Sequence, residues 1–251
     1  MTKQNNILAK YDSVKLENQT TSFITIPRKL VNVEIPVNEK GLFIQLLLEA
    51  GVSPITDYHY VLKNQTISSI VHMIFWKKEN KRINSVHVKQ TKELLEQLKE
   101  HRLIKISEYQ DDRFDIILPT AKNLREGDDG FVKLYADSLK KIVAKSSGIQ
   151  RLKNLLFYAA VRSRVFENYQ QQVVVTESPN YFAKLTKISE TVAKNRLKWM
   201  RDNEVLAYFK AERANTFQHE KYYYADMHDA HILTDVVKGY LEQGLIKRVL
   251  E

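Results

Sequence analysis

The sequence predicts an α+β fold that is mainly helical, in which the order helix, helix, helix, strand, turn, strand occurs twice. Three observations support this prediction. The 251 residues include only 7 Gly and 5 Pro, which is typical of a chain rich in helices and poor in glycine loops. The hydrophobic fraction is 43%, enough for the core of one large domain or two small ones. In each half, apolar spacing changes from helical to alternating.

The first half begins with a polar stretch and a β-branched one. Residues 1–21 predict a flexible N-terminal segment. Residues 22–35, "SFITIPRKLVNVEI", predict a strand and a connection. The elements that follow are helices at 37–51, 66–78 and 85–101, and then a hairpin of two alternating strands at 103–119. Residues 22–121 are therefore expected to form the first domain.

A charged stretch with glycines, "TAKNLREGDDG", separates the two halves. Together with the amphipathic stretch after it, it predicts a linker and connecting helix over residues 122–148. The elements expected beyond it are helices at 149–169, 178–186 and 187–203, a short strand at 171–175, a hairpin with strands at 204–210 and 220–226, and a last helix at 229–251. Residues 149–251 are expected to form the second domain.

The two halves match when the chain is shifted by 102 residues. Leu95 then falls on Leu197 and Leu98 on Met200, which are core positions of the third helix in each half. Leu103 falls on Val205, at the start of the following strand. The shared order of elements indicates a duplicated architecture. This order resembles that of the winged-helix domain, a helix-turn-helix whose third helix can enter a DNA groove, closed by a β-hairpin wing.

The third helix of the second half carries the main functional prediction. On a helical wheel, its apolar residues fall within one half of the circumference. These are Val192, Ala193, Leu197, Trp199 and Met200. The candidate DNA-binding residues of the other half are Lys187, Thr191, Lys194, Asn195, Lys198 and Arg201. Asparagine can pair with adenine and lysine or arginine with guanine, so this face has the side chains that read base edges.

Basic residues near this helix are candidates for phosphate contacts. They are Lys184, Arg213 and Lys221. The alternative is an ordinary solvated helix. Such helices usually alternate charges at i,i+4 spacing, whereas only Glu190 and Asp202 oppose the bases of this helix.

The matching helix of the first half has a different charge pattern. Lys89 and Lys92 are candidate DNA contacts, but Glu93 and Glu96 alternate with them, as on a solvated face. Further bases precede the helix, and they are Lys77, Lys78, Lys81 and Arg82. This first domain is expected either to touch phosphates through those bases or to bind protein.

Composition narrows the function classes. The formal net charge is +9, which favours a polyanionic partner. The absence of cysteine excludes disulfides and thiolate zinc sites and fits a cytoplasmic protein. The sequence contains no stretch of ~18 apolar residues, no signal-peptide core and no phosphate-binding or hydrolase motif, so neither a membrane protein nor an enzyme is expected.

Two further features of the sequence are candidate sites. The stretch "ADMHDAH", residues 225–231, has carboxylates and imidazoles, but its spacing fits a polar helix start better than a metal site. No metal or cofactor is therefore expected. The last helix has an apolar face that either packs on its own domain or forms a homodimer, as helix-turn-helix proteins often do when they read paired half-sites.

The whole resembles the replication initiator proteins of plasmids and phages. The segment "FITIPRKLVNVEIPVNEKGLFIQLLLEAG" is similar to their opening, and "RLKWMRDNEVLAYFK" is similar to the end of a winged helix. The resemblance implies sequence-specific binding of double-stranded DNA at repeated origin or operator sites, together with recruitment of host replication proteins. The alternatives are a winged-helix transcriptional regulator and a replisome adaptor that binds protein rather than DNA.

Overall fold

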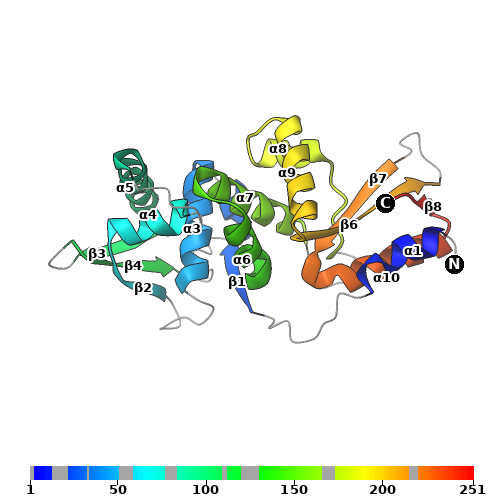
Figure 1. The fold of residues 1–251 in the computed structure, drawn as a ribbon, viewed down its shortest axis with the longest axis horizontal. Helices are drawn as coiled ribbons and strands as arrows, with labels where there is room; N and C mark the ends of the chain where they lie inside the picture. Colours follow the sequence, from blue (N-terminus) through cyan, green and yellow to red (C-terminus); the bar gives the residue numbers. More distant parts are fainter. Residues whose placement is uncertain are drawn as a thin grey trace. The chain divides into compact units, whose positions relative to one another are not determined.

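The chain is α+β and mainly helical, with small antiparallel sheets, as the sequence predicted (Figure 1). The computed structural model describes residues 3–12, 22–32, 34–50, 59–76, 84–108, 112–119, 130–165, 173–214 and 220–251. The chain divides into two compact units. The N-terminal unit is Ser22–Ser163, and the C-terminal unit combines Met1–Thr21 with Arg164–Glu251.

The N-terminal unit consists of helices and strands that precede, form and follow a β-hairpin. Its elements are β1 (Phe23–Pro27), α2 (Arg28–Asn32), α3 (Val37–Ala50), β2 (His59–Gln65), α4 (Ile67–Phe75), α5 (Ser85–Glu100), β3 (Lys105–Glu108), β4 (Phe114–Pro119), β5 (Phe131–Tyr135), α6 (Ala136–Lys145) and α7 (Gly148–Arg162). The hairpin β3–β4 joins β2 in a sheet of order β2-β4-β3. The hairpin follows α5 directly in the chain, whereas β2 precedes α4.

Two long helices form the centre of this unit. Helix α7 is buried along most of its length, as expected of a core helix that is apolar on several sides. Its backbone approaches α3 closely at Gly41, where an added Cβ would lie 2.1 Å from the carbonyl oxygen of Leu152. The missing side chain of Gly41 is therefore what allows α3 and α7 to touch.

The boundary between the units differs from the division expected from the sequence. Strand β5 lies in the predicted linker but pairs with β1, with Ile24 opposite Leu134 and Ile26 opposite Val132. All four side chains are buried. Helices α6 and α7 also belong to the N-terminal unit, which ends at Ser163. The linker prediction failed to anticipate that β1, more than 100 residues earlier, supplies β5 with a pairing partner.

The C-terminal unit is built on one three-stranded sheet. Its elements are α1 (Lys3–Leu8), η1 (Ala9–Tyr11), α8 (Pro179–Leu185), α9 (Glu190–Asp202), β6 (Leu206–Arg213), β7 (Glu220–Asp226), η3 (Met227–Asp229), α10 (Ala230–Glu242) and β8 (Ile246–Val249). The strand order is β7-β6-β8, and Val175 forms an isolated bridge with Tyr224 on the outer side of β7. One face of the sheet packs on α10 through Phe209, Tyr223, Leu233 and Val237.

Part of the N-terminal segment, which the sequence predicted to be flexible, packs on the C-terminal unit. Leu8 and Tyr11 are buried in the core of the C-terminal unit. The Tyr11 hydroxyl accepts a hydrogen bond from the Tyr208 amide at 2.8 Å and donates one to the Tyr208 carbonyl at 3.2 Å. These two bonds satisfy backbone groups of β6 beyond the residues that pair with β8. Polarity alone did not reveal this anchor.

Candidate functional site

Helix α9 follows α8 through a short turn whose geometry is fixed by the backbone. The Ile188 amide donates to the Ala183 carbonyl at 2.9 Å, and Lys187 between them has a left-handed φ of 52°. The Ser189 hydroxyl then accepts the Val192 amide at 3.3 Å and caps α9. Helices α8 and α9 are thus joined by a short, restrained turn, and β6 follows α9 after a second tight turn (Figure 1).

The buried side of α9 differs in two places from the helical-wheel prediction. Ala193, Leu197 and Met200 are at most 1% exposed, as expected. Val192, however, is 38% exposed, whereas Arg196 is buried. Val192 lies in the first turn of α9. The buried side of α9 therefore lacks Val192 and includes Arg196.

The exposed side of α9 brings together most of the predicted reading face. Thr191, Lys194, Asn195 and Lys198 are all exposed. Lys194 forms an ion pair with Glu190 at 2.7 Å, but both side chains are about half exposed or more, at 61% and 47%. Exposed pairs of this kind contribute only about 0–1 kcal/mol, so the lysine can exchange its partner at little cost.

The two lysines of the α8–α9 turn extend this surface. Lys184 near the end of α8 and Lys187 in the turn are both exposed. The chain order places them just before the α9 N-terminus. The face formed by Lys184, Lys187, Thr191, Lys194, Asn195 and Lys198 is called the α9 face below.

Arg201 does not belong to the α9 face. Its guanidinium lies over the rings of Tyr208 and Tyr222, at 4.7 and 4.8 Å from their centroids. Tyr208 is on strand β6 and Tyr222 is on strand β7. Arg201 is partly buried there. Its observed contacts fasten α9 to the hairpin, which was not anticipated from the wheel.

Arg213 and Lys221 lie on the opposite side of the sheet from those tyrosines. Side chains alternate along a strand, and Arg213 follows Phe209 and Ala211, which face α10. Lys221 is paired with Ala211 and faces the same way. The sheet therefore separates these two predicted phosphate contacts from the tyrosines that meet α9. Their surroundings are described under the further inference.

The N-terminal unit presents its predicted residues differently. Lys89 and Glu93 of α5 form an ion pair at 3.9 Å, and Lys99 and Glu96 form another at 3.4 Å. Lys92 lines a groove of about 820 Å³ between α5 and the hairpin β3–β4. Lys77, Lys78, Lys81 and Arg82 lie outside the described residues.

The floor of the groove beside α5 is apolar. Val88 and Leu95 line it from the helix, and Ile106 and Phe114 from the hairpin. Its rim carries both signs of charge, including Glu96, Asp112 and Arg113.

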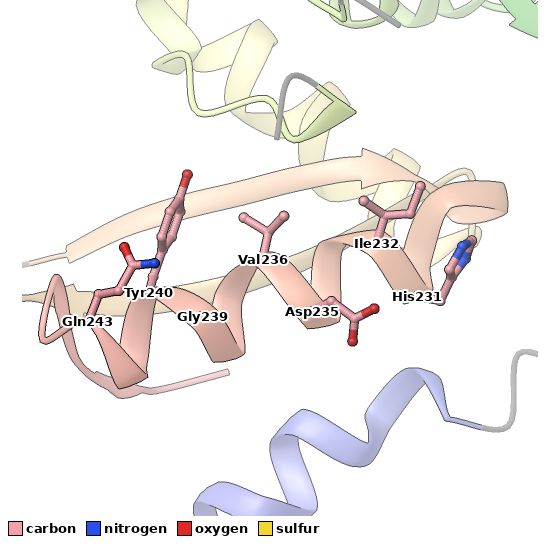
Figure 2. A pocket seen from close by; sticks show the side chains of 7 residues that line it. All are labelled: His231, Ile232, Asp235, Val236, Gly239, Tyr240 and Gln243. Atoms are coloured by element: carbon pink, nitrogen blue, oxygen red, sulfur yellow. The ribbon is translucent and has the colours of Figure 1, made fainter. Parts of the chain in front are cut away.

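Helix α10 has one row of side chains that its own core does not fully cover. Ile232, Val236 and Tyr240 project from the same side of the helix and border a shallow cavity of about 290 Å³ (Figure 2). Leu233 and Val237 are buried in the core. The apolar face predicted for the last helix is thus mostly divided between residues buried in the core and the row of Ile232, Val236 and Tyr240.

The stretch 225–231 is organised by backbone contacts. The Asp226 carboxylate accepts the His228 amide at 2.8 Å and caps η3. In the parts of the chain that the structure describes, no three histidine, aspartate or glutamate side chains are grouped as metal ligands would be. Within the same residues, no helix has the length and apolar character needed to cross a membrane.

Comparisons with protein-family models, with curated proteins and with solved structures found no match to this chain.

Proposed function

We propose that the protein binds double-stranded DNA with sequence specificity through the α9 face, as part of a winged-helix module. The observation that carries the proposal is the composition of that face. Thr191, Asn195 and four lysines are exposed on or beside a capped helix whose opposite side is held by a core. Helices with this arrangement fit the major groove of DNA, where lysine and asparagine recognise guanine and adenine.

The order of elements supports the winged-helix interpretation in both halves. In the N-terminal unit, α3, β2, α4, α5, β3 and β4 occur in that order, and the sheet order is β2-β4-β3. The C-terminal unit repeats the last part with α8, α9, β6 and β7, and Val175 takes the place of the first strand beside β7. We infer two modules of related design.

Tandem modules of this kind favour a replication initiator of a plasmid, phage or other mobile element. One module would bind an origin site through the α9 face, while the other would bind a host replication protein. A transcriptional regulator that binds operator repeats uses the same contacts. The two roles differ in the proteins that are recruited after DNA binding.

The groove beside α5 supports protein binding by the N-terminal unit. Its apolar floor and mixed charges contrast with the lysine-rich α9 face. In an initiator, this groove would hold a segment of a host replication protein. In the adaptor alternative, it would be the principal site, and the chain would not bind duplex DNA even at low salt.

The proposal is tested by measuring duplex affinity as a function of salt concentration. Replacing Lys194 and Lys198 with alanine should weaken binding and reduce the slope of log affinity against log salt by about 1–2. Lys140→Ala with Lys238→Ala is the matched control, because both of these lysines are exposed and lie on α6 and α10. Equal slopes for the two double variants would remove α9 from the interface.

A further inference from the structure

A cavity of about 310 Å³ lies on the α10 side of the sheet in the C-terminal unit. Four segments meet around it: the residues after the Val175 bridge, the hairpin β6–β7, helix α10 and the turn before β8. Its principal lining side chains are Thr176, Arg213, Lys221, Tyr223, Tyr240 and Leu245. The cavity is separate from the α9 face, and the inference below does not rest on the proposed function.

The backbone around the cavity is fixed by hydrogen bonds. Val175 exchanges two with Tyr224, at 2.7 and 2.8 Å, which places Thr176 beside β7. The Ala214 amide donates to the Leu245 carbonyl at 3.0 Å and holds the turn before β8 against the end of β6. The lining side chains therefore project from restrained positions.

An irregularity in β6 coincides with the cavity. Glu212 is opposite Arg248, but its neighbour Arg213 is opposite Ile246, so the register with β8 shifts between them. The side chain of Arg213 remains on the α10 side of the sheet, where it lines the cavity.

Two cations face the cavity, and the lining residues include no acid. Burial lowers the pKa of Lys221, and the positive charge of Arg213 lowers it further. Glu177 acts in the opposite direction on Lys221, but its carboxylate is ion-paired with Arg164 at 3.1 Å. In the described part of the chain, no carboxylate lies within ion-pair distance of Arg213 or Lys221. Two like charges held together with no carboxylate in direct contact favour a bound anion.

Neutral donors complete the site. The hydroxyls of Thr176 and Tyr240 belong to lining residues, and the Tyr223 ring packs against the Tyr240 ring at 5.8 Å. Arginine and lysine together with hydroxyl groups are the usual partners of phosphate oxygens. We propose that this cavity is an anion site that holds a phosphate group, with Arg213 and Lys221 as its cationic contacts and the hydroxyls of Thr176 and Tyr240 as further donors.

The test titrates the full chain with pyrophosphate by calorimetry, with chloride used to keep ionic strength constant. The wild type should bind saturably, and Arg213→Gln with Lys221→Gln should bind at least about tenfold more weakly. The control is Lys140→Ala with Lys238→Ala, which removes the same charge elsewhere and should bind like the wild type. Absence of saturable binding to the wild type, or equal binding by the glutamine variant, would overturn the proposal.

Folding of the glutamine variant is checked by Trp199 fluorescence, and Arg213→Lys provides a second variant that keeps the charge. The lysine substitution should bind more tightly than the double glutamine variant, because a cation remains in the cavity. If the Arg213→Lys variant and the double glutamine variant bound pyrophosphate equally weakly, the proposed role of charge would be contradicted.

A second arm identifies the source of the phosphate group. If the group belongs to a DNA backbone, pyrophosphate should compete with duplex DNA, and the glutamine variant should lose duplex affinity. If it belongs to a free phosphate compound, duplex affinity should be the same with and without pyrophosphate. Both results support an anion site. Because Lys194 and Lys198 are unchanged in these variants, failure here is distinguishable from failure of the α9 proposal.

Discussion

Helices α5 and α9 share a scaffold and differ in the surface that the scaffold presents. Thr91, Leu95 and Leu98 of α5 are buried, as are Ala193, Leu197 and Met200 at the positions 102 residues later. Both helices end alike. Arg102 and Glu204 have left-handed φ angles of 57° and 54°, and each is followed by an amide that bonds back to the helix at 2.9 Å.

The exposed positions of the two helices are not alike. Asn195 and Lys198 of α9 correspond to Glu93 and Glu96 of α5. On α5 the acids pair with neighbouring lysines, so the surface charge is largely compensated. The comparison teaches that core spacing sets where such a helix lies, while a few exposed residues decide which partner it suits.

The largest expected effect tests the shared scaffold. Leu98→Ala and Met200→Ala each remove a fully buried side chain, so each should lower the free energy of unfolding of its own unit by about 2–5 kcal/mol. The chain has 2 Trp, with Trp76 in the N-terminal unit and Trp199 in the C-terminal unit. Urea unfolding of Trp199→Phe and Trp76→Phe backgrounds therefore reports each unit separately. If only one of the two alanine variants lost stability against urea, α5 and α9 would not share the same scaffold.

The next test concerns the one buried position where the helices differ in charge. Leu94 of α5 corresponds to Arg196 of α9, and both are buried. Leu94→Arg should cost about 3 kcal/mol, because it places a charge in a core built for leucine. Arg196→Leu should change stability by only about 1 kcal/mol, since burial already disfavours the charged guanidinium and lowers its pKa. Urea unfolding of both variants checks this, and a tolerated Leu94→Arg would contradict it.

A smaller effect is expected at Tyr11, which anchors the N-terminal segment to the C-terminal unit. Tyr11→Phe removes both hydrogen bonds to the Tyr208 backbone and should destabilise this unit by about 1–3 kcal/mol. The Trp199 signal should report the loss, while the Trp76 signal serves as the internal control.

The same anchor gives a pH dependence. Burial raises the pKa of Tyr11 above the ordinary tyrosine value near 10. Because the unfolded chain then ionises first, the contribution of Tyr11 is fully present below about pH 10 and is lost as pH rises through the folded pKa. The stability difference between the wild type and Tyr11→Phe should therefore shrink in alkaline urea titrations. A difference that grows with pH would show the opposite sign.

The smallest expected effect is at the matched turns. Arg102→Gly and Glu204→Gly each relieve a left-handed conformation that side chains disfavour, offset by the greater freedom of glycine in the unfolded chain. Each should raise the free energy of unfolding by about 0.5 kcal/mol. Thermal unfolding measures this effect, and the midpoint temperatures of the two variants would shift by unequal amounts if the turns were not equivalent.

Local periodicity predicted the third helix of each half and most of its buried positions, but the last helix, predicted over 229–251, ends at Glu242, and Ile246–Val249 forms strand β8 instead. Helix α9, Glu190–Asp202, lies within the predicted 187–203, and α5 lies within 85–101. The spacing of Leu197 and Met200 was sufficient because core contacts of a helix repeat every turn. The exposure of Thr191, Lys194, Asn195 and Lys198 followed from the same periodicity.

Features that depend on distant parts of the chain were not predictable in this way. The side of the sheet that Arg213 faces depends on the strand register and on which face of the sheet α10 covers. The spacing of basic residues along the sequence predicts neither of these. The Tyr11 anchor joins residues 197 positions apart. Arg201 satisfied the wheel pattern, but two tyrosines of the hairpin hold it.

The central claim is that α9, and not α5, binds DNA, and exchanging their surfaces tests it most directly. Asn195→Glu with Lys198→Glu gives α9 the acids of α5, and Glu93→Asn with Glu96→Lys does the reverse. In duplex-binding titrations at about 0.1 M salt, the first variant should lose about 100-fold or more in affinity, and the second should keep or exceed wild-type affinity. Wild-type affinity in the first variant, or a comparable loss in the second, would contradict the account.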